Sequence, residues 1–407
     1  MSFLKNTTSF SLFKIENLSD GILGSFGEKL RQFVFMSIDD TAEEQSYGWT
    51  GFEDMEDFNF IDYEVHPWLY FSFRVDKRNI APGLYKRHFE TALKKELEEY
   101  AKMGRKYIPR ERKKEIKTQI KLKLLAKTLP TPALYDVIIN TLTHDVYFGS
   151  ANKKIIDLFG DYLLKTFGVV TSKKGEQITL DEAMNADYEM LSKIQLYKLT
   201  PLVRSQIFVE KYIQLKNNYI NLYPTIFTDF QQSDMKAHTG IILGEEFLTW
   251  LWYQADRQTK FKYVKGQKES GFYAVFENKV SVRGNNGENN LFTSVKGQNN
   301  PMLEARLGLE TGKKVNTATI VLSDSQYSFI FSLDAKVFAF SSFQIERLPW
   351  QEKETVHKIL LKMPFFERAM EYFNIVYEEF LFLRLDTSRW SQETDKIKEW
   401  IENNKRS

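Results

Sequence analysis

A lysine- and arginine-rich stretch over residues 105–127 limits the folds open to this chain more than any other feature. It holds ten Lys or Arg and two Glu, an excess of eight positive charges in a chain of 407 residues with a net charge of only +2. Pro109 suits the first turn of a helix, where its missing N–H costs nothing. From there four cations recur at helical spacing and share one face: Arg110, Lys114, Lys117 and Lys121. We expect the helix to pack on a core through an adjoining apolar stripe, formed by Ile116, Ile120 and Leu124.

A row of like charges repels itself, so we expect an anionic ligand to lie across this face of the helix. The phosphate groups of nucleic acid are the first candidate, because binding them releases their condensed counterions. The competing interpretation is a helix whose scattered charges are simply solvated. The row alone leaves both interpretations open.

Composition excludes several classes of protein. The chain has no cysteine, which rules out disulfides, zinc–thiolate sites and thiol nucleophiles. Its length allows two or three domains, each with its own core. The first residues alternate like a strand and lack the apolar segment of a signal peptide. No apolar run approaches the roughly 20 residues that span a bilayer, so we expect a cytoplasmic protein without membrane contact.

Hydrophobic periodicity predicts strands and helices in turn over the first 170 residues. The expected strands are 9–16, 69–75, 135–140 and 145–149. The expected helices, besides the basic one, are 22–35, 82–103 and 155–167. This pattern predicts an α+β fold with antiparallel sheets and long helices.

The remaining residues predict a buried helix at 244–254, β-rich hairpins at 271–282 and 317–345, and helices at 351–385 and 388–404. We therefore expect four consecutive parts. They are an α+β part at 1–170 that carries the basic helix, a mixed helical connecting region at 171–260, a β-rich insert at 261–347 and C-terminal helices at 348–407.

A second charged stretch, Asp39–Glu64, carries ten acids and no Lys or Arg. The simplest interpretation is a hydrated surface. One alternative is a module that docks a basic protein partner, and another is a metal-dependent nuclease. Nothing in the spacing of the acids favours a metal site. The five histidines are isolated as well, without the spacing of metal ligands. We therefore expect no catalysis, no metal and no cofactor.

The order of these features resembles the amino-terminal part of the bacterial recombination-associated RdgC family, from about Phe10 to Gly168. The matching features are the opening strand, Gly48-Trp49, the strand before Lys77-Arg78, the helix from Pro82, the lysine-rich helix, the hairpin at 135–149 and the helix that follows. The segment GEEFLTWLW (244–252) and the tail from Arg384 to Trp400 are similar to longer members of that family.

The resemblance implies a DNA-binding protein that is not an enzyme. The family forms closed homodimeric rings that surround duplex DNA without reading its sequence, and it restrains RecA-dependent recombination. A nucleoid location and antagonism of RecA would follow, with binding of single-stranded DNA left open. This chain is longer than typical members and carries an inserted β-rich region. The cations implied to face DNA are Lys77, Arg78, Arg105, Lys106, Arg110, Lys113, Lys114, Lys117 and Lys121.

Overall fold

The computed structural model divides the chain into two compact units. The core unit comprises residues 1–19, 65–69 and 138–407, and the hairpin unit comprises residues 20–64 and 70–137. Most of the predicted connecting region 171–260 lies outside the described residues. The described residues are 3–15, 18–39, 41–167, 243–265, 268–284, 291–295, 303–335, 338–345, 354–384 and 387–403.

The hairpin unit is built on β4 (Trp68–Lys77), the strand that the sequence predicted at 69–75. In the strand order β4 lies between β2 (Gln45–Thr50) and β5 (Thr131–Asn140), and it also pairs with the short β3 (Glu64–Val65). β2 pairs with it antiparallel, with Gln45 opposite Lys77. The rings of Phe26, Trp49 and Phe71 are buried and pack together on one face of this sheet.

The predicted helix 22–35 is wrong, because two short helices, α1 (Asp20–Gly24) and α2 (Phe26–Gln32), take its place. The Ser25 hydroxyl between them donates to the carbonyl of Gly21, a local bond that competes with helix continuation. The chain then leaves the helix because the Phe35 N–H donates to the Trp49 carbonyl of β2, at 2.9 Å. A Cβ on Gly48 would lie 2.4 Å from the Phe35 Cα, so only glycine permits this close approach.

The core unit contains an antiparallel sheet in the order β6-β1-β12-β11-β10-β8-β7, with β9 paired to β8. Along β11 buried and half-buried residues alternate, the pattern of a sheet with one face on the core. The strands are β1 (Thr7–Lys14), β6 (Asp145–Phe148), β7 (Lys260–Lys265), β8 (Lys268–Arg283), β9 (Leu291–Val295), β10 (Lys314–Ser323), β11 (Ser328–Asp334) and β12 (Phe340–Ile345).

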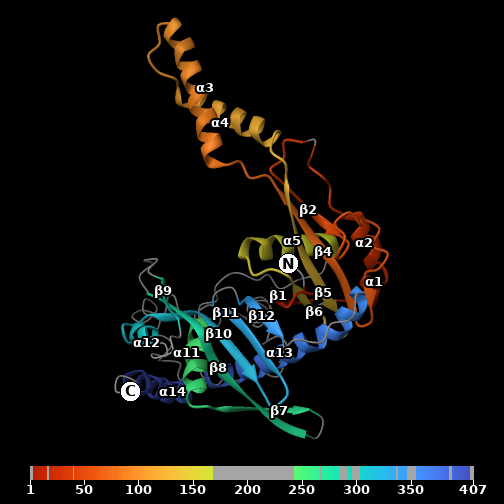
Figure 1. Ribbon diagram of the computed structural model, residues 1–407, viewed down its shortest axis with the longest axis vertical. Helices are drawn as coiled ribbons and strands as arrows, with labels where there is room; N and C mark the ends of the chain where they lie inside the picture. Colours follow the sequence, from red (N-terminus) through yellow and green to blue (C-terminus); the bar gives the residue numbers. More distant parts are fainter. Residues whose placement is uncertain are drawn as a thin grey trace, which may run out of the picture. The chain divides into compact units, whose positions relative to one another are not determined.

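Helices α11 and α13 pack on this sheet, as Figure 1 shows. Their contact surface is aromatic: the rings of Phe247 and Tyr377 lie 4.8 Å apart, and Phe373 lies 5.0 Å from Phe340 of β12. The buried helix, the long helix and the terminal helix predicted from the sequence are all present. The helices of the core unit are α5 (Lys153–Phe167), α11 (Leu243–Asp256), α12 (Leu303–Glu310), α13 (Thr355–Arg384) and α14 (Thr387–Asn403).

Strand β1 joins the two ends of the chain in one sheet. It pairs with β6 along one edge and with β12 along the other. The rings of Phe10 and Phe340 stack at 5.0 Å across this junction. The structure therefore draws other boundaries than the four parts predicted at 1–170, 171–260, 261–347 and 348–407. Pairing between strands distant in sequence makes the β-rich region continuous with the N-terminal strand.

The fold is α+β, as the sequence predicted. None of the helices in the described part of the chain has the length and apolar character needed to cross a membrane.

Lys362 of α13 ties the N-terminal segment to the core unit. Its buried ammonium group donates to the carbonyl oxygens of Phe3, at 3.0 Å, and Lys5. Burial, together with the neighbouring charge of Lys358, lowers the pKa of Lys362 from 10.5 to about 8.

Replacing Lys362 by Met should change how the free energy of unfolding depends on pH. The unfolded chain keeps this proton up to pH 10.5 and the folded chain only up to about pH 8, so the wild-type protein gains stability as the pH rises through that window. Relative to Lys362→Met the gain should be on the order of 3 kcal/mol. Urea unfolding at several pH values measures it, with the exposed Lys154→Met as control. Parallel pH profiles for wild type and Lys362→Met would contradict this expectation.

Candidate nucleic-acid interface

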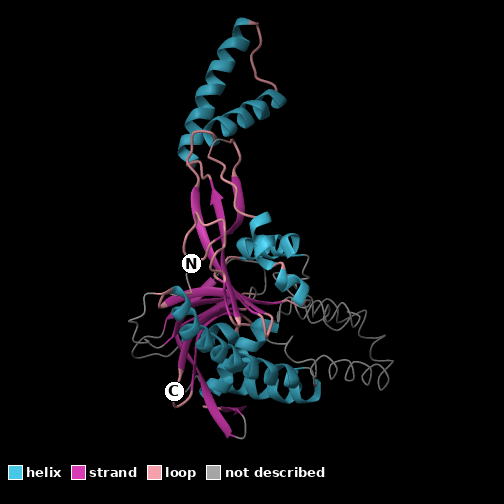
Figure 2. Cartoon of the chain, turned by 90° about the vertical axis from the view of Figure 1, so that its right-hand side faces the viewer, coloured by secondary structure: helices cyan, strands magenta, loops and turns pink. Residues whose placement is uncertain are grey.

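The basic stretch forms one arm of a helical hairpin in the hairpin unit. Helix α3 (Pro82–Lys102) leads through a loop with Gly104 at φ +75° into α4 (Arg110–Leu125). Pro109 is the residue before α4 rather than a residue of its first turn. Figure 2 shows the two helices side by side, beyond the ends of the strands that lead into them. Within the hairpin α3 contacts α4, but none of its residues is buried.

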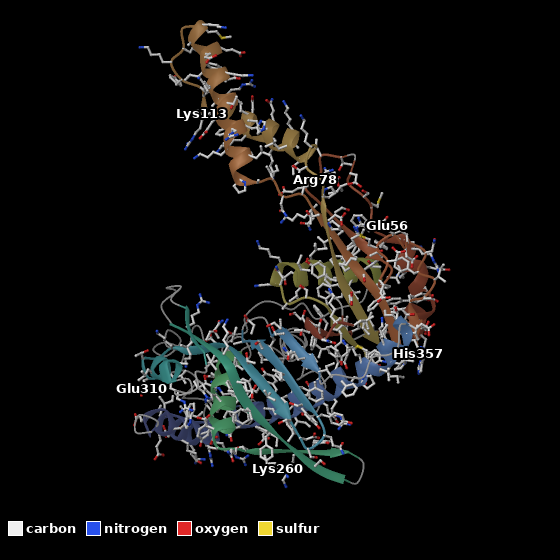
Figure 3. The ribbon with its side chains drawn as sticks, viewed as in Figure 1. Glu56, Arg78, Lys113, Lys260, Glu310 and His357 are labelled. Carbon is white, nitrogen blue, oxygen red and sulfur yellow. The ribbon has the colours of Figure 1, made fainter. Side chains whose placement is uncertain are left out.

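The apolar stripe predicted on α4 faces inward as expected. Ile116 and Leu124 are buried, and Ile120 between them is half-buried. The adjoining row of Arg110, Lys114, Lys117 and Lys121 is exposed at all four positions. At 1.5 Å of rise per residue the row is about 17 Å long, enough to follow several phosphates of a nucleic-acid backbone. Lys113 is also exposed on α4 (Figure 3).

Three cations of the row have partners within the hairpin unit. Lys114 lies 3.7 Å from Glu111, and both side chains are more than two-thirds exposed. The Lys117 ammonium lies 5.5 Å from the centre of the Phe89 ring on α3. Lys121 forms an ion pair with Glu44. Exposed pairs of this kind contribute only about 0–1 kcal/mol, so an anionic ligand can compete with them.

Arg112 lies outside the row and links the two helices. Its guanidinium donates to Glu96 of α3 at 2.6 Å and to Glu115 at 2.9 Å. The hydrogen bond from Arg112 holds the pKa of Glu96 below its usual value. This cation of the basic stretch is therefore occupied in holding the hairpin together, a role that its position in the sequence did not reveal.

The loop between the helices carries two of the predicted cations, Arg105 and Lys106, both exposed. The Arg105 guanidinium lies 5.8 Å from the centre of the Tyr100 ring. Tyr107 follows with 75% of its surface exposed. The loop therefore places positive charge and an aromatic ring next to the first turn of α4.

Lys77, far from the basic helix in sequence, comes close to its last turns. It is the exposed final residue of β4, and its charge acts on Glu44, the partner of Lys121. The hydrogen bond from Lys121 lowers the pKa of Glu44 most, and the charges of Lys121 and Lys77 add to it. The structure thus brings Lys77 into one basic region with the row on α4.

The expectation for Arg78 is corrected: this side chain is 2% exposed and does not face a ligand. One terminal nitrogen of its guanidinium donates to the carbonyls of Ile38, at 2.7 Å, and Asp39, at 2.9 Å. The other donates to the carbonyls of Thr41 and Glu43. Because arginine carries five N–H donors in a rigid fork, one side chain can hold four carbonyls of a loop. Arg78 is therefore a structural residue.

Arg74, which lies on β4 four residues before Arg78, holds the next part of the acidic stretch. It makes two 2.9 Å bonds to Asp76 and one of 2.8 Å to Glu56. Its guanidinium also lies 4.0 Å from the centre of the Phe35 ring. The carboxylates of Asp54 and Asp57 accept backbone N–H groups within the loop. In the described residues no three His, Asp or Glu side chains are placed to hold a metal ion.

The two C-terminal tryptophans, Trp390 and Trp400, pack within the core unit. The Trp390 ring lies 5.7 Å from Phe380, and Arg384 lies 5.0 Å above its centre. The Trp400 ring lies 5.6 Å from Trp252 and donates its N–H to Asp256. Both side chains are half-buried by these neighbours.

Comparisons with known proteins identify no family for this chain. Its sequence matches no protein-family model, and a search of curated proteins finds no similar sequence.

Replacing Arg78 by Met should lower the free energy of unfolding by about 2–4 kcal/mol, because it removes a buried fork and leaves several carbonyls without donors. Lys77→Met, at the exposed neighbouring position, should change it by less than about 0.5 kcal/mol. Urea unfolding followed by tryptophan fluorescence measures both. An Arg78→Met variant as stable as wild type would show that the hydrogen bonds of this arginine do not stabilise the fold.

Proposed function

We propose that this chain is a DNA-binding protein that holds its ligand through phosphate contacts, without reading sequence. The observation that carries the proposal is the row of four exposed cations on one face of α4, with Arg105, Lys106, Lys113 and Lys77 around it. Phosphate contacts position a protein on nucleic acid but carry no sequence information directly.

The distribution of charge over the chain supports the same proposal. Residues 82–127 contain fifteen Lys and Arg and six Glu, an excess of nine positive charges. The chain as a whole has a net charge of +2, so all other residues together carry a net charge of −7. A polyanion is therefore attracted to the hairpin and repelled by the remainder, which orients the encounter.

The resemblance to the RdgC family is the ground for three finer proposals. They are a homodimer that encircles DNA, a nucleoid location, and a restraining effect on RecA-dependent recombination. We also propose binding without catalysis. Magnesium-dependent cleavage of plasmid DNA, lost on replacing Asp54 or Asp57, would instead favour a nuclease.

Changing Arg110, Lys114, Lys117 and Lys121 together to Ala should weaken binding to duplexes of unrelated sequence about equally. Each lost phosphate contact lowers the slope of log K against log salt by about 0.9, so the slope should flatten by roughly 3 to 4 units. Fluorescence anisotropy at several salt concentrations measures it. The hairpin should remain folded, because the buried Ile116 and Leu124 are unchanged and Ala favours helix.

Two control variants distinguish the effect of this row from a general effect of removing positive charge from the chain. The first replaces four exposed lysines of the core unit by Ala: Lys153, Lys154, Lys279 and Lys398. The second replaces Lys123 and Lys127, which follow the row in sequence but lie outside its face. Both control variants should keep most of the wild-type slope of log K against log salt. A folded quadruple variant of the row with the wild-type slope would mean that its cations are only solvated.

The homodimer proposal predicts twice the chain mass in solution. Light scattering after size exclusion, with protein at tens of micromolar, should give that mass with and without duplex DNA. A protein that stays monomeric under both conditions would remove the ring, but not the phosphate contacts of the hairpin.

A further inference from the structure

Glu44 is the acidic residue that reaches the cation row from outside the hairpin. Its carboxylate accepts a hydrogen bond from the Lys121 ammonium, 77 positions away in sequence, and both side chains are 49% exposed. Lys77 adds a second positive charge beside the same carboxylate. Glu44 thus lies between two of the cations proposed to bind phosphate.

The backbone around Glu44 is held in place from both sides. Its carbonyl accepts the Arg78 N–H at 2.9 Å, and the next residue, Gln45, pairs with Lys77 in the ladder of β2 and β4. The Arg78 guanidinium fixes the loop that precedes it through the carbonyls of Ile38, Asp39, Thr41 and Glu43. The backbone that carries this carboxylate is therefore already ordered, so that only the Glu44 side chain has to be ordered for the contact with α4.

We propose that Glu44 is an intramolecular competitor for the phosphate ligand, so that DNA must displace its carboxylate from Lys121 and Lys77. The proposal rests on the proposed function of the hairpin, and it adds an internal contact that limits the affinity of the hairpin for DNA. A carboxylate and a phosphate oxygen accept the same charge-assisted hydrogen bonds from an ammonium group. A phosphate oxygen that takes this position on the Lys121 ammonium displaces the carboxylate, and Arg78 acts as the positioning residue of the competitor.

Removing the carboxylate should therefore raise affinity rather than lower it. Glu44→Gln keeps the size and hydrogen-bonding capacity of the side chain and removes its charge. The strength of an exposed ion pair corresponds to an affinity about two to five times higher at low salt. The effect should shrink as salt screens the pair.

Glu43→Gln is the matched control, because it removes the same charge one residue away. The Glu43 side chain is exposed and makes no ion pair within the described part of the chain. A general loss of negative charge would raise affinity equally in both variants. Competition at Lys121 and Lys77 raises it in Glu44→Gln alone.

The experiment measures the affinity of wild type, Glu44→Gln and Glu43→Gln for two probes, a duplex of arbitrary sequence and inorganic tripolyphosphate. Each substitution is then repeated in a Lys77→Ala, Lys121→Ala background. We expect Glu44→Gln to bind the probe with two- to fivefold higher affinity than wild type, and Glu43→Gln to bind it with nearly the wild-type affinity. In the double-alanine background the increase in affinity should disappear.

The two probes separate failure of this inference from failure of the proposed function. DNA binding with no gain in Glu44→Gln, or with equal gains in both glutamine variants, overturns the competitor and leaves the DNA-binding proposal standing. A gain for tripolyphosphate with no binding of DNA supports the competitor and overturns the DNA ligand. Loss of affinity in Glu44→Gln means that the carboxylate orients Lys121, which also overturns the competitor. If wild type binds neither probe, both proposals fail.

Discussion

Arg74 of β4 and Arg78, the residue directly after that strand, fix the part of the hairpin unit on which the proposed binding surface depends. Arg78 donates to the carbonyls of Ile38, Asp39, Thr41 and Glu43. Arg74 forms a two-bond pair with Asp76 and a further pair with Glu56. Burying guanidinium groups is costly unless their donors are used. Here acidic side chains and carbonyls accept from both guanidinium groups, although the Nε of Arg78 has no partner among the described residues. The acidic stretch and the strand therefore stabilise each other, and this places Glu44 beside the basic helix.

The hairpin itself has little apolar contact to hold it. No residue of α3 is buried, and α4 contributes Ile116, Leu124 and Leu125 to the apolar contact. The bonds from Arg112 to Glu96 and from Lys121 to Glu44 tie α4 to α3 and to the loop before β2. Most of the hairpin surface is thus free to carry charge. This suits the proposed contact with a polyanion, whereas a larger core would have covered the cations.

In the core unit, by contrast, strands from both ends of the chain have to be brought together in one sheet. β1 lies between β6 and β12, and aromatic rings on β1, β12 and α13 pack against one another across this junction. Aromatic side chains bury a large area with few rotatable bonds, which offsets much of the entropic cost of bringing distant segments together. Lys362 adds a polar tie to the first residues of the chain.

The sequence alone determined the elements whose signal is local. Residue type and turn signals predicted β4, α3 and the turn before β6. Helical spacing predicted α5, α11, α13 and the face that the four cations share on α4. Only the tertiary structure decided which cations are free. Arg78 follows Lys77 directly, yet Lys77 is exposed at the end of β4 and Arg78 is buried, because the Arg78 side chain meets a loop 40 residues away in the sequence. The pairing of Glu44 with Lys121 and of β1 with β12 could not be predicted either. Each joins segments that are distant in sequence, and no local sequence pattern indicates that they lie close together.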